Sequence, residues 1–267
     1  MIELYRKKIK EIKYHKFLEK IKIIVNIYKK KNFKHVISYL KQLKYIKLFN
    51  KNYKTNYYID IEIIHLSKII IGLDGVNLLL KIVFFNLIDI SLNEVDINDF
   101  SSLKNPKFPK LKILSLGKNK ITSIDFLNSL PFPKLENLML GVNLIQDLSP
   151  LKMYKSNNIK DLFLLGNKIN DISPLIDMDT PNLEILYLVS NIEDISPLIK
   201  CKFTKLKQLS FSHNKIQNIT PLKDYNFSDL ELLILSNNKI EKVGALFRAK
   251  FPKLNDITLK NNLIFNI

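Results

Sequence analysis

One spacing of aliphatic residues recurs along most of the chain, and such an internal repeat constrains the fold more than any other sequence feature. The unit is clear from Leu111 through Leu114, Leu116, Asn119 and Ile121. Copies of this unit begin at residues 87, 111, 135, 159, 183, 206, 230 and 254. Six of the seven intervals are 24 residues and one is 23. A stack of equivalent coils is therefore expected over 87–267, with a truncated eighth copy at its end.

Each coil is expected to contribute a short strand whose aliphatic residues point inward. A single unit cannot bury that apolar row alone, so neighbouring units must stack to do so. The sequence predicts an α/β solenoid with a parallel sheet on its concave face and short 3-10 or helical turns on its convex face. Ser149-Pro150, Ser173-Pro174, Ser196-Pro197 and Thr220-Pro221 occupy one repeat position. We interpret each Ser or Thr as the N-cap of a convex turn and assign Asp125 and Ser101 the same role.

An asparagine follows the strand in seven repeats and is expected to bond to backbone groups where the strand ends, because its amide both donates and accepts. This structural ladder consists of Asn119, Asn143, Asn167, Asn191, Asn214, Asn238 and Asn262. In the 23-residue repeat we place the missing residue between Asn191 and Ile192. Five phenylalanines near the repeat ends are expected to pack along the convex layer, interrupted by Ser156 and Thr180. They are Phe108, Phe132, Phe203, Phe227 and Phe251.

The pattern L-x-x-L-x-L-x-x-N-x-I over about two thirds of the chain is the consensus of the leucine-rich-repeat family, which this chain therefore resembles. The extension I-x-x-I-x-P-L resembles the subclass found in phosphatase-1 regulatory subunits and bacterial internalins, with longer repeats here. The resemblance implies a protein-interaction scaffold rather than an enzyme. A phosphatase regulatory subunit, and an RNA-associated solenoid like the leucine-rich subunit of a small nuclear ribonucleoprotein, are alternatives.

A partner is expected on the concave face, because strand side chains alternate and the residues between the inward leucines face outward. Met139, Phe163 and Tyr187 occupy that outward position in three consecutive repeats. Large apolar side chains with a polar rim suit a binding hot spot. The alternatives are that these residues only favour strand formation, or that the chain's own terminus covers them. The other predicted partner-binding residues are Ile113, Asp161, Leu165, Ile185 and Val189.

Residues 1–60 lack the repeat and carry 17 Lys or Arg against 4 Asp or Glu, most of the net charge of +17. Apolar residues from Ile9 to Ile27, and again over 33–49, recur at helical spacing. We interpret 1–60 as a basic, mainly helical cap. Binding to nucleic acid or an anionic membrane is an alternative, and so is a degenerate F-box over 36–51, which would make the chain a ubiquitin-ligase substrate receptor. Residues 61–86 are interpreted as a transition, and as one decayed repeat containing Ile63, Leu66, Ile71, Leu73, Val76 and Leu79.

The sequence offers no grouping suited to catalysis or metal binding. The four histidines are scattered, Cys201 is the one cysteine, and no nucleotide-binding or nucleophile motif occurs. We predict no catalytic residue, no metal and no cofactor. One cysteine, no secretory signal and no apolar span favour a cytoplasmic or nuclear protein. The last strand edge, 254–267, could pair with another chain to form a weak dimer.

Overall fold

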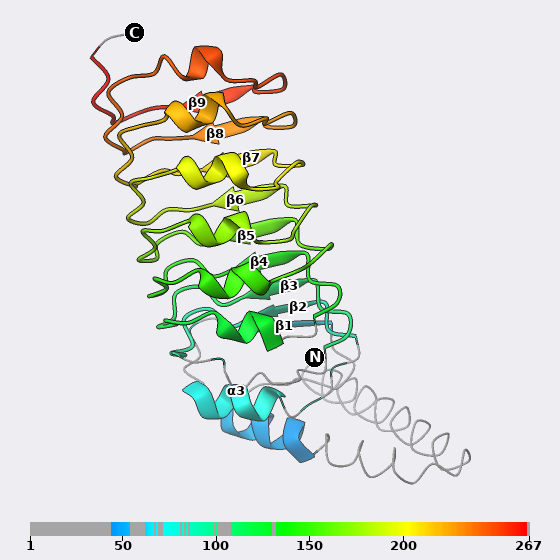
Figure 1. Cartoon of the computed structure of the whole chain (residues 1–267). Coiled ribbons are helices and arrows are strands. Elements are labelled where there is room, and N and C mark those ends of the chain that lie inside the picture. The colour runs from blue at the N-terminus through cyan, green and yellow to red at the C-terminus, as the bar shows by residue number, and fades with distance from the viewer. Residues whose placement is uncertain are drawn as a thin grey trace, which may run out of the picture.

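The computed structural model describes residues 44–53, 62–66, 68, 72–80, 82, 84, 86–98, 100, 108–129 and 132–265. The expected helix from Ile9 to Ile27, most of the F-box-like stretch and Ser101 therefore lie outside the described residues. Figure 1 shows the described part as a ladder of coils, with strands along one side and short helices along the other.

Nine parallel strands form one sheet in chain order, as a stack of successive coils requires. They are β1 (Ile63–His65), β2 (Asp89–Ser91), β3 (Ile113–Ser115), β4 (Asn137–Met139), β5 (Asp161–Phe163), β6 (Ile185–Tyr187), β7 (Gln208–Ser210), β8 (Leu232–Ile234) and β9 (Asp256–Thr258). From β2 onward, paired residues are one repeat apart, so equivalent positions align in columns across the sheet, for example Leu138 beside Leu162. The predicted α/β solenoid with a curved parallel sheet is confirmed.

The middle residue of each strand points into the core. Leu114, Leu138, Leu162 and Leu186 are at most 3% exposed, and the flanking strand residues face outward. The inward leucines before and after the strand, such as Leu111 and Leu116, are fully buried. Stacking in register thus closes one continuous apolar core.

The convex side carries short 3-10 helices, in keeping with the predicted turns. They are η1 (Asp125–Ser129), η2 (Ser149–Met153), η3 (Ser173–Ile176), η4 (Ser196–Lys200), η5 (Thr220–Lys223) and η6 (Leu246–Arg248). The phenylalanine packing is visible at both ends of this layer. The ring centroids of Phe108 and Phe132 are 6.3 Å apart, and those of Phe227 and Phe251 are 5.5 Å apart.

The predicted N-caps of these turns are wrong. Ser149 is the first residue of η2, not its cap, and it donates its N–H and its hydroxyl to Asp147, at 2.7 and 2.5 Å. Asp171 and Asp194 accept the same two hydrogen bonds from Ser173 and Ser196, and Asn218 accepts the N–H of Thr220. At the start of η1 the serine comes first and the aspartate second, and the N–H of Asp125 donates to the Ser123 hydroxyl. In all of these turns the acceptor is therefore the side chain two residues before the donor N–H, as in an Asx-turn.

The described N-terminal end contains a helical stretch at 44–53 and the helix α3 (Gly72–Leu80). Both lie at the β1 end of the ladder in Figure 1. Ile46, Phe49, Val76 and Leu79 from these helices are buried within the same core as the repeats. The apolar surface of the first coil is thereby covered.

Strand β1 is shifted relative to the predicted decayed repeat. Counting back 24 residues from Ile90 gives Leu66, but Ile64 pairs with Ile90 and is buried, and the predicted first residue of the repeat, Ile63, is 52% exposed. The offset from β1 to β2 is therefore longer than the repeat that spaces the later strands. Counting back one repeat length from Leu87 consequently selects the wrong residue.

The asparagine ladder is held by a recurring set of hydrogen bonds. The Asn143 side chain donates to the carbonyls of Leu116 and Leu140, each at 3.0 Å, and accepts the N–H of Ile121 at 3.1 Å. One side chain therefore joins its own coil to two points of the preceding coil. Equivalent bonds are made by Asn119, Asn167, Asn214, Asn238 and Asn262.

Asn191 does not belong to this ladder, and the predicted position of the missing residue is wrong. Asn191 is exposed, and its N–H bonds to the Ile169 carbonyl, as the residue after the ladder asparagine does in other repeats. Ser190 instead occupies the ladder position, where its N–H bonds to Asn214 at 3.0 Å. The hydroxyl of Ser190 is buried and has no hydrogen-bond partner among the described residues.

Backbone angles show which residue is absent. The residue before the ladder asparagine has a positive φ in every other repeat from 87 onward, and this position holds Glu94, Lys118, Val142, Gly166, His213, Asn237 and Asn261. Neither Val189 nor Ser190 has a positive φ. The 23-residue repeat thus lacks this left-handed residue between Val189 and Ser190.

Candidate protein-binding surface

Three large side chains form a column on the outward face of the sheet, here called the aromatic ladder: Met139, Phe163 and Tyr187. Strand pairing places Met139 beside Phe163 and Phe163 beside Tyr187. The rings of Phe163 and Tyr187 meet edge to face, with centroids 5.3 Å apart and planes at 85°. The Tyr187 hydroxyl donates to Gln208 at 2.7 Å. All three side chains are half-buried, so part of each remains available to another molecule.

A hollow lies beside this ladder, where the sheet carries two glycines, and we call it the glycine hollow. Its volume is about 390 Å³, within the size range of ligand pockets. Gly117 and Gly141 form its floor, and Met139, Phe163 and Leu165 are among its walls. A Cβ at Gly141 would lie 3.1 Å from Leu165 Cγ, so the glycine allows the Leu165 side chain to pack close to the backbone of the neighbouring coil.

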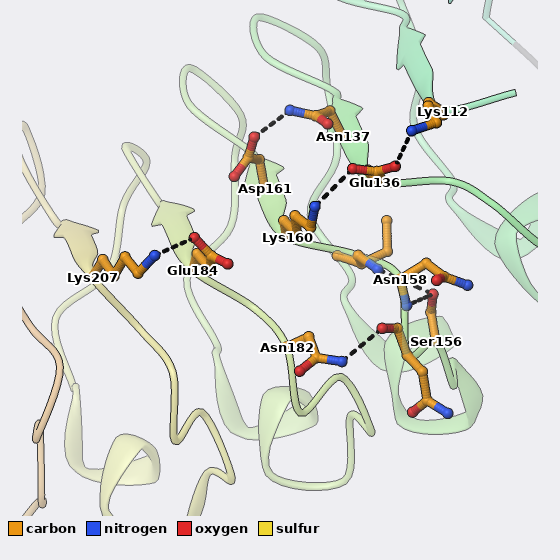
Figure 2. Close-up of polar contacts among 12 residues, drawn as sticks. Lys112, Glu136, Asn137, Ser156, Asn158, Lys160, Asp161, Asn182, Glu184 and Lys207 are labelled. Atoms are coloured by element: carbon orange, nitrogen blue, oxygen red, sulfur yellow. Dashed lines mark hydrogen bonds and ion pairs between the residues drawn. The ribbon is translucent and has the colours of Figure 1, made fainter. Parts of the chain in front are cut away.

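Asp161 lies two residues before Phe163 on β5 and faces the same side of the sheet. Asn137 on the neighbouring strand donates a hydrogen bond to its carboxylate (Figure 2). Burial of the group, and then the charge of Glu184, raise the pKa of the Asp161 carboxyl above its usual value. The carboxylate is thus partly withdrawn from water, and the Lys160 charge, which lowers its pKa, offsets only part of this effect.

Lysines are nearly excluded from the outward face of the sheet. Each of the eight repeats has three outward positions, which alternate with inward ones. They are Asp89, Ser91 and Asn93 in the first repeat and Asp256, Thr258 and Lys260 in the last. Their charged residues are Asp89, Asp161, Asp256 and Lys260. In a chain of net charge +17, this face is slightly acidic.

The lysines nearest the strands lie at the edge where the strands begin, in a ladder of alternating charge. Figure 2 shows Glu136 between Lys112 and Lys160, at 2.7 and 2.8 Å, and Glu184 bonded to Lys207 at 2.8 Å. The two lysine partners lower the pKa of Glu136. These positive charges are therefore already matched within the chain.

The remaining predicted binding residues flank the ladder. Ile113 and Ile185 are outward residues of β3 and β6, and Val189 lies beyond the end of β6. All three are half-buried. Gly117 and Gly141 were not predicted as part of a site. A signal existed, since both occupy the outward position at which the next two repeats carry Leu165 and Val189.

Groups suited to catalysis do not gather anywhere in the described part of the chain. Cys201 is buried, its Sγ contacts the Pro197 carbonyl, and burial raises its pKa to about 12, so the thiol is protonated at neutral pH. Among the described residues, no three His, Cys, Asp or Glu side chains are placed to share a metal ion. Membrane-spanning length and apolarity are not combined in any described helix.

The geometry defines a repeat solenoid whose parallel sheet carries an uncovered apolar column. Residues 181–224 match the family model described as Leucine Rich repeats (2 copies). No curated protein matches the sequence significantly. An internalin C2 from Listeria monocytogenes is 27% identical, with a TM-score of 0.55 over 73% of this chain and 76% of that chain.

Two further solved structures match this chain. An internalin (inlF) from Listeria monocytogenes is 23% identical, with a TM-score of 0.46 over 84% of this chain and 75% of that one. A plant ice-binding protein is 19% identical, with a TM-score of 0.54 over 76% of this chain and 64% of that one. The chain is thus similar to leucine-rich-repeat proteins, in sequence over 181–224 and in its solenoid fold. This solenoid fold supports a general role as a protein-interaction scaffold.

Proposed function

We propose that this protein binds another protein on the concave face of its sheet and that it has no catalytic activity of its own. The observation that carries the proposal is the aromatic ladder, in which the half-buried Phe163 and Tyr187 rings pack edge to face on an outward surface. Aromatic side chains bring large contact area at little entropic cost, and they dominate the energetics of many interfaces.

The surroundings of the ladder support this function. The apolar glycine hollow adjoins it, and polar groups at Asp161 and Asn137 border it, which matches an apolar centre with a hydrogen-bonding rim. The predicted contact residues Ile113, Leu165, Ile185 and Val189 extend the same surface.

The experiment compares proteins captured from cells of the native organism by the wild-type chain and by the double variant Phe163→Asp, Tyr187→Asp. Phe247→Asp is the matched control, because Phe247 is an exposed aromatic residue of the convex η6 helix, 75% exposed. Partners should be retained by Phe247→Asp and lost by the double variant, while circular dichroism shows all three proteins folded. Retention of every partner by the folded double variant would refute the concave site.

The alternatives remain predictions of different strength. The similarity to internalin C2 supports an internalin-like subclass, and the phosphatase-regulator version depends on the sequence resemblance alone. The ubiquitin-ligase version depends on 36–51, of which only 44–51 are described. An RNA partner on the sheet is disfavoured by its slightly acidic outward face, because RNA binding depends on positive charge.

We further propose that residues 1–60 act mainly as a cap, supported by the burial of Ile46 and Phe49 in the repeat core. Nucleic-acid or membrane binding through this segment, and a weak dimer through the β9 edge, are secondary proposals. A cytoplasmic or nuclear location is proposed from the one cysteine, which suits a reducing compartment.

A further inference from the structure

The Asp161 carboxylate forms no ion pair with any described residue, although the charge of Lys160 acts on it at longer range. Its nearest lysine in sequence, Lys160, bonds to Glu136 at 2.8 Å, as Figure 2 shows. Asp161 forms no ion pair with any residue in the described ranges, and its one hydrogen bond there comes from the uncharged Asn137. A half-buried carboxylate of this kind costs folding stability unless a positive charge joins it.

The aromatic rings provide a second feature that suits a cation. Asp161 and Phe163 lie on the same face of β5, about 7 Å apart along the strand. Tyr187 pairs with Phe163 on the next strand. Lys and Arg side chains favour contact with aromatic rings while their charged ends bond to a carboxylate. The carboxylate and the rings together therefore form a binding site suited to a basic side chain.

The glycine hollow requires a different kind of group. Its walls include Met139, Phe163 and Leu165, and its floor is glycine backbone. Nearby charges at its rim are already matched, because Lys118 bonds to Glu94 at 2.8 Å. This space suits an uncharged, apolar side chain. Asp161 and Leu165 are four residues apart, about 13 Å in an extended chain.

We propose that the partner is a protein segment that places a Lys or Arg side chain against Asp161 and an apolar side chain two to four residues away in the glycine hollow. This inference depends on the proposed function, because it names the chemistry of the partner at the same surface. Charge complementarity favours it, since the outward face of the sheet holds three Asp and one Lys although the chain is strongly basic. Among the described residues, no lysine bonds to Asp161, because the neighbouring Lys160 bonds to Glu136.

The test uses random twelve-residue peptides displayed on phage and selected on the purified full-length chain. Enriched peptides are expected to contain a Lys or Arg two to four residues from a large apolar residue. Synthetic copies are then measured for affinity against wild type, Asp161→Asn and Asp256→Asn. The control Asp256→Asn removes the same charge from the same strand position on β9, four strands away.

Asp161→Asn is expected to weaken peptide binding about tenfold or more, because the ion pair is lost at a partly desolvated site. Asp256→Asn should change the affinity less than twofold. Asparagine still accepts the Asn137 hydrogen bond, so the variant should melt at or above the wild-type temperature. Replacing the apolar residue of the peptide by alanine should also weaken binding about tenfold or more.

The outcomes separate this inference from the proposed function. Peptides that lose binding to the Phe163→Asp, Tyr187→Asp variant but lack basic residues, or bind Asp161→Asn unchanged, overturn the inference and leave the concave site standing. Peptides that bind the double variant as well as wild type count against both. Enrichment of acidic peptides, or of none at all, also overturns the inference.

Discussion

Replacing Asn143 by alanine removes four hydrogen bonds at one buried point of the solenoid. The three acceptors lose little, because the Leu116 carbonyl keeps a bond from Asn119 and the Leu140 carbonyl keeps one from Asn167, each at 3.0 Å, and the Gly141 carbonyl keeps the N–H of Lys118. The N–H of Ile121 is different, since Asn143 is its side-chain acceptor at 3.1 Å and the residue is fully buried. The substitution therefore leaves the buried N–H of Ile121 without its side-chain acceptor.

The orphaned N–H should cost about 1–3 kcal/mol, and each weakened carbonyl bond adds a smaller loss of up to about 1 kcal/mol. We expect Asn143→Ala to lower the free energy of unfolding by about 2–4 kcal/mol. Asn191→Ala is the matched control, because Asn191 matches the same consensus position in sequence but is exposed and outside the ladder. It should change stability by less than about 0.5 kcal/mol.

Urea unfolding followed by circular dichroism measures both effects, with the midpoint and slope taken from the linear dependence on urea. Equal losses for the two variants would show that Asn191 carries a ladder role and that the assignment of Ser190 to that position is mistaken. An Asn143→Ala variant that unfolds at the wild-type urea midpoint would refute the hydrogen-bond reasoning itself.

Three further outcomes are expected. Val142 has a φ of 55°, which is unfavourable for a β-branched residue, so Val142→Asn should stabilise the protein by roughly 1 kcal/mol in urea unfolding, whereas Leu144→Asn, without that backbone conformation, should not. Glu136→Gln should destabilise by about 0.5–1 kcal/mol at low salt, and because the folded-state pKa of Glu136 is lowered, this difference should be present at neutral pH and vanish as the pH falls through that pKa. An unchanged difference in acid would contradict the ion-pair assignment. Cys201, with a pKa of about 12, should react with iodoacetamide at pH 8 far more slowly in the native protein than in urea, and equal rates would contradict its burial.

Surface features that a repeating pattern controls could be located from the sequence alone. Met139, Phe163 and Tyr187 could be placed in one column because strand side chains alternate and the repeat length is constant over those coils. Whether they bind a partner stays a prediction. The glycine hollow was not predicted, because a cavity depends on what the neighbouring strands carry on each side of Gly117 and Gly141.

The sequence misled where the period changes and where a turn depends on its neighbours. Ile63 was chosen as an inward residue by counting back one repeat length from Leu87, but the offset from β1 to β2 is longer than the repeat, so Ile63 faces outward. Ser149 was chosen as a cap from its type and its following proline, although Asp147 provides the acceptor. Both outcomes depend on local backbone geometry that residue type alone does not specify.

The regular period and the inward aliphatic positions are properties of the sequence itself, because a strand alternates faces and each coil needs a neighbour to bury its leucines. Only the tertiary structure decided that Ser190, not Asn191, fills the ladder position of the short repeat. The physical reason is that hydrogen bonds between adjacent coils fix which residue aligns with the ladder. The missing residue therefore falls at the position that best preserves those hydrogen bonds. Aligning the repeats by residue type alone does not identify that position.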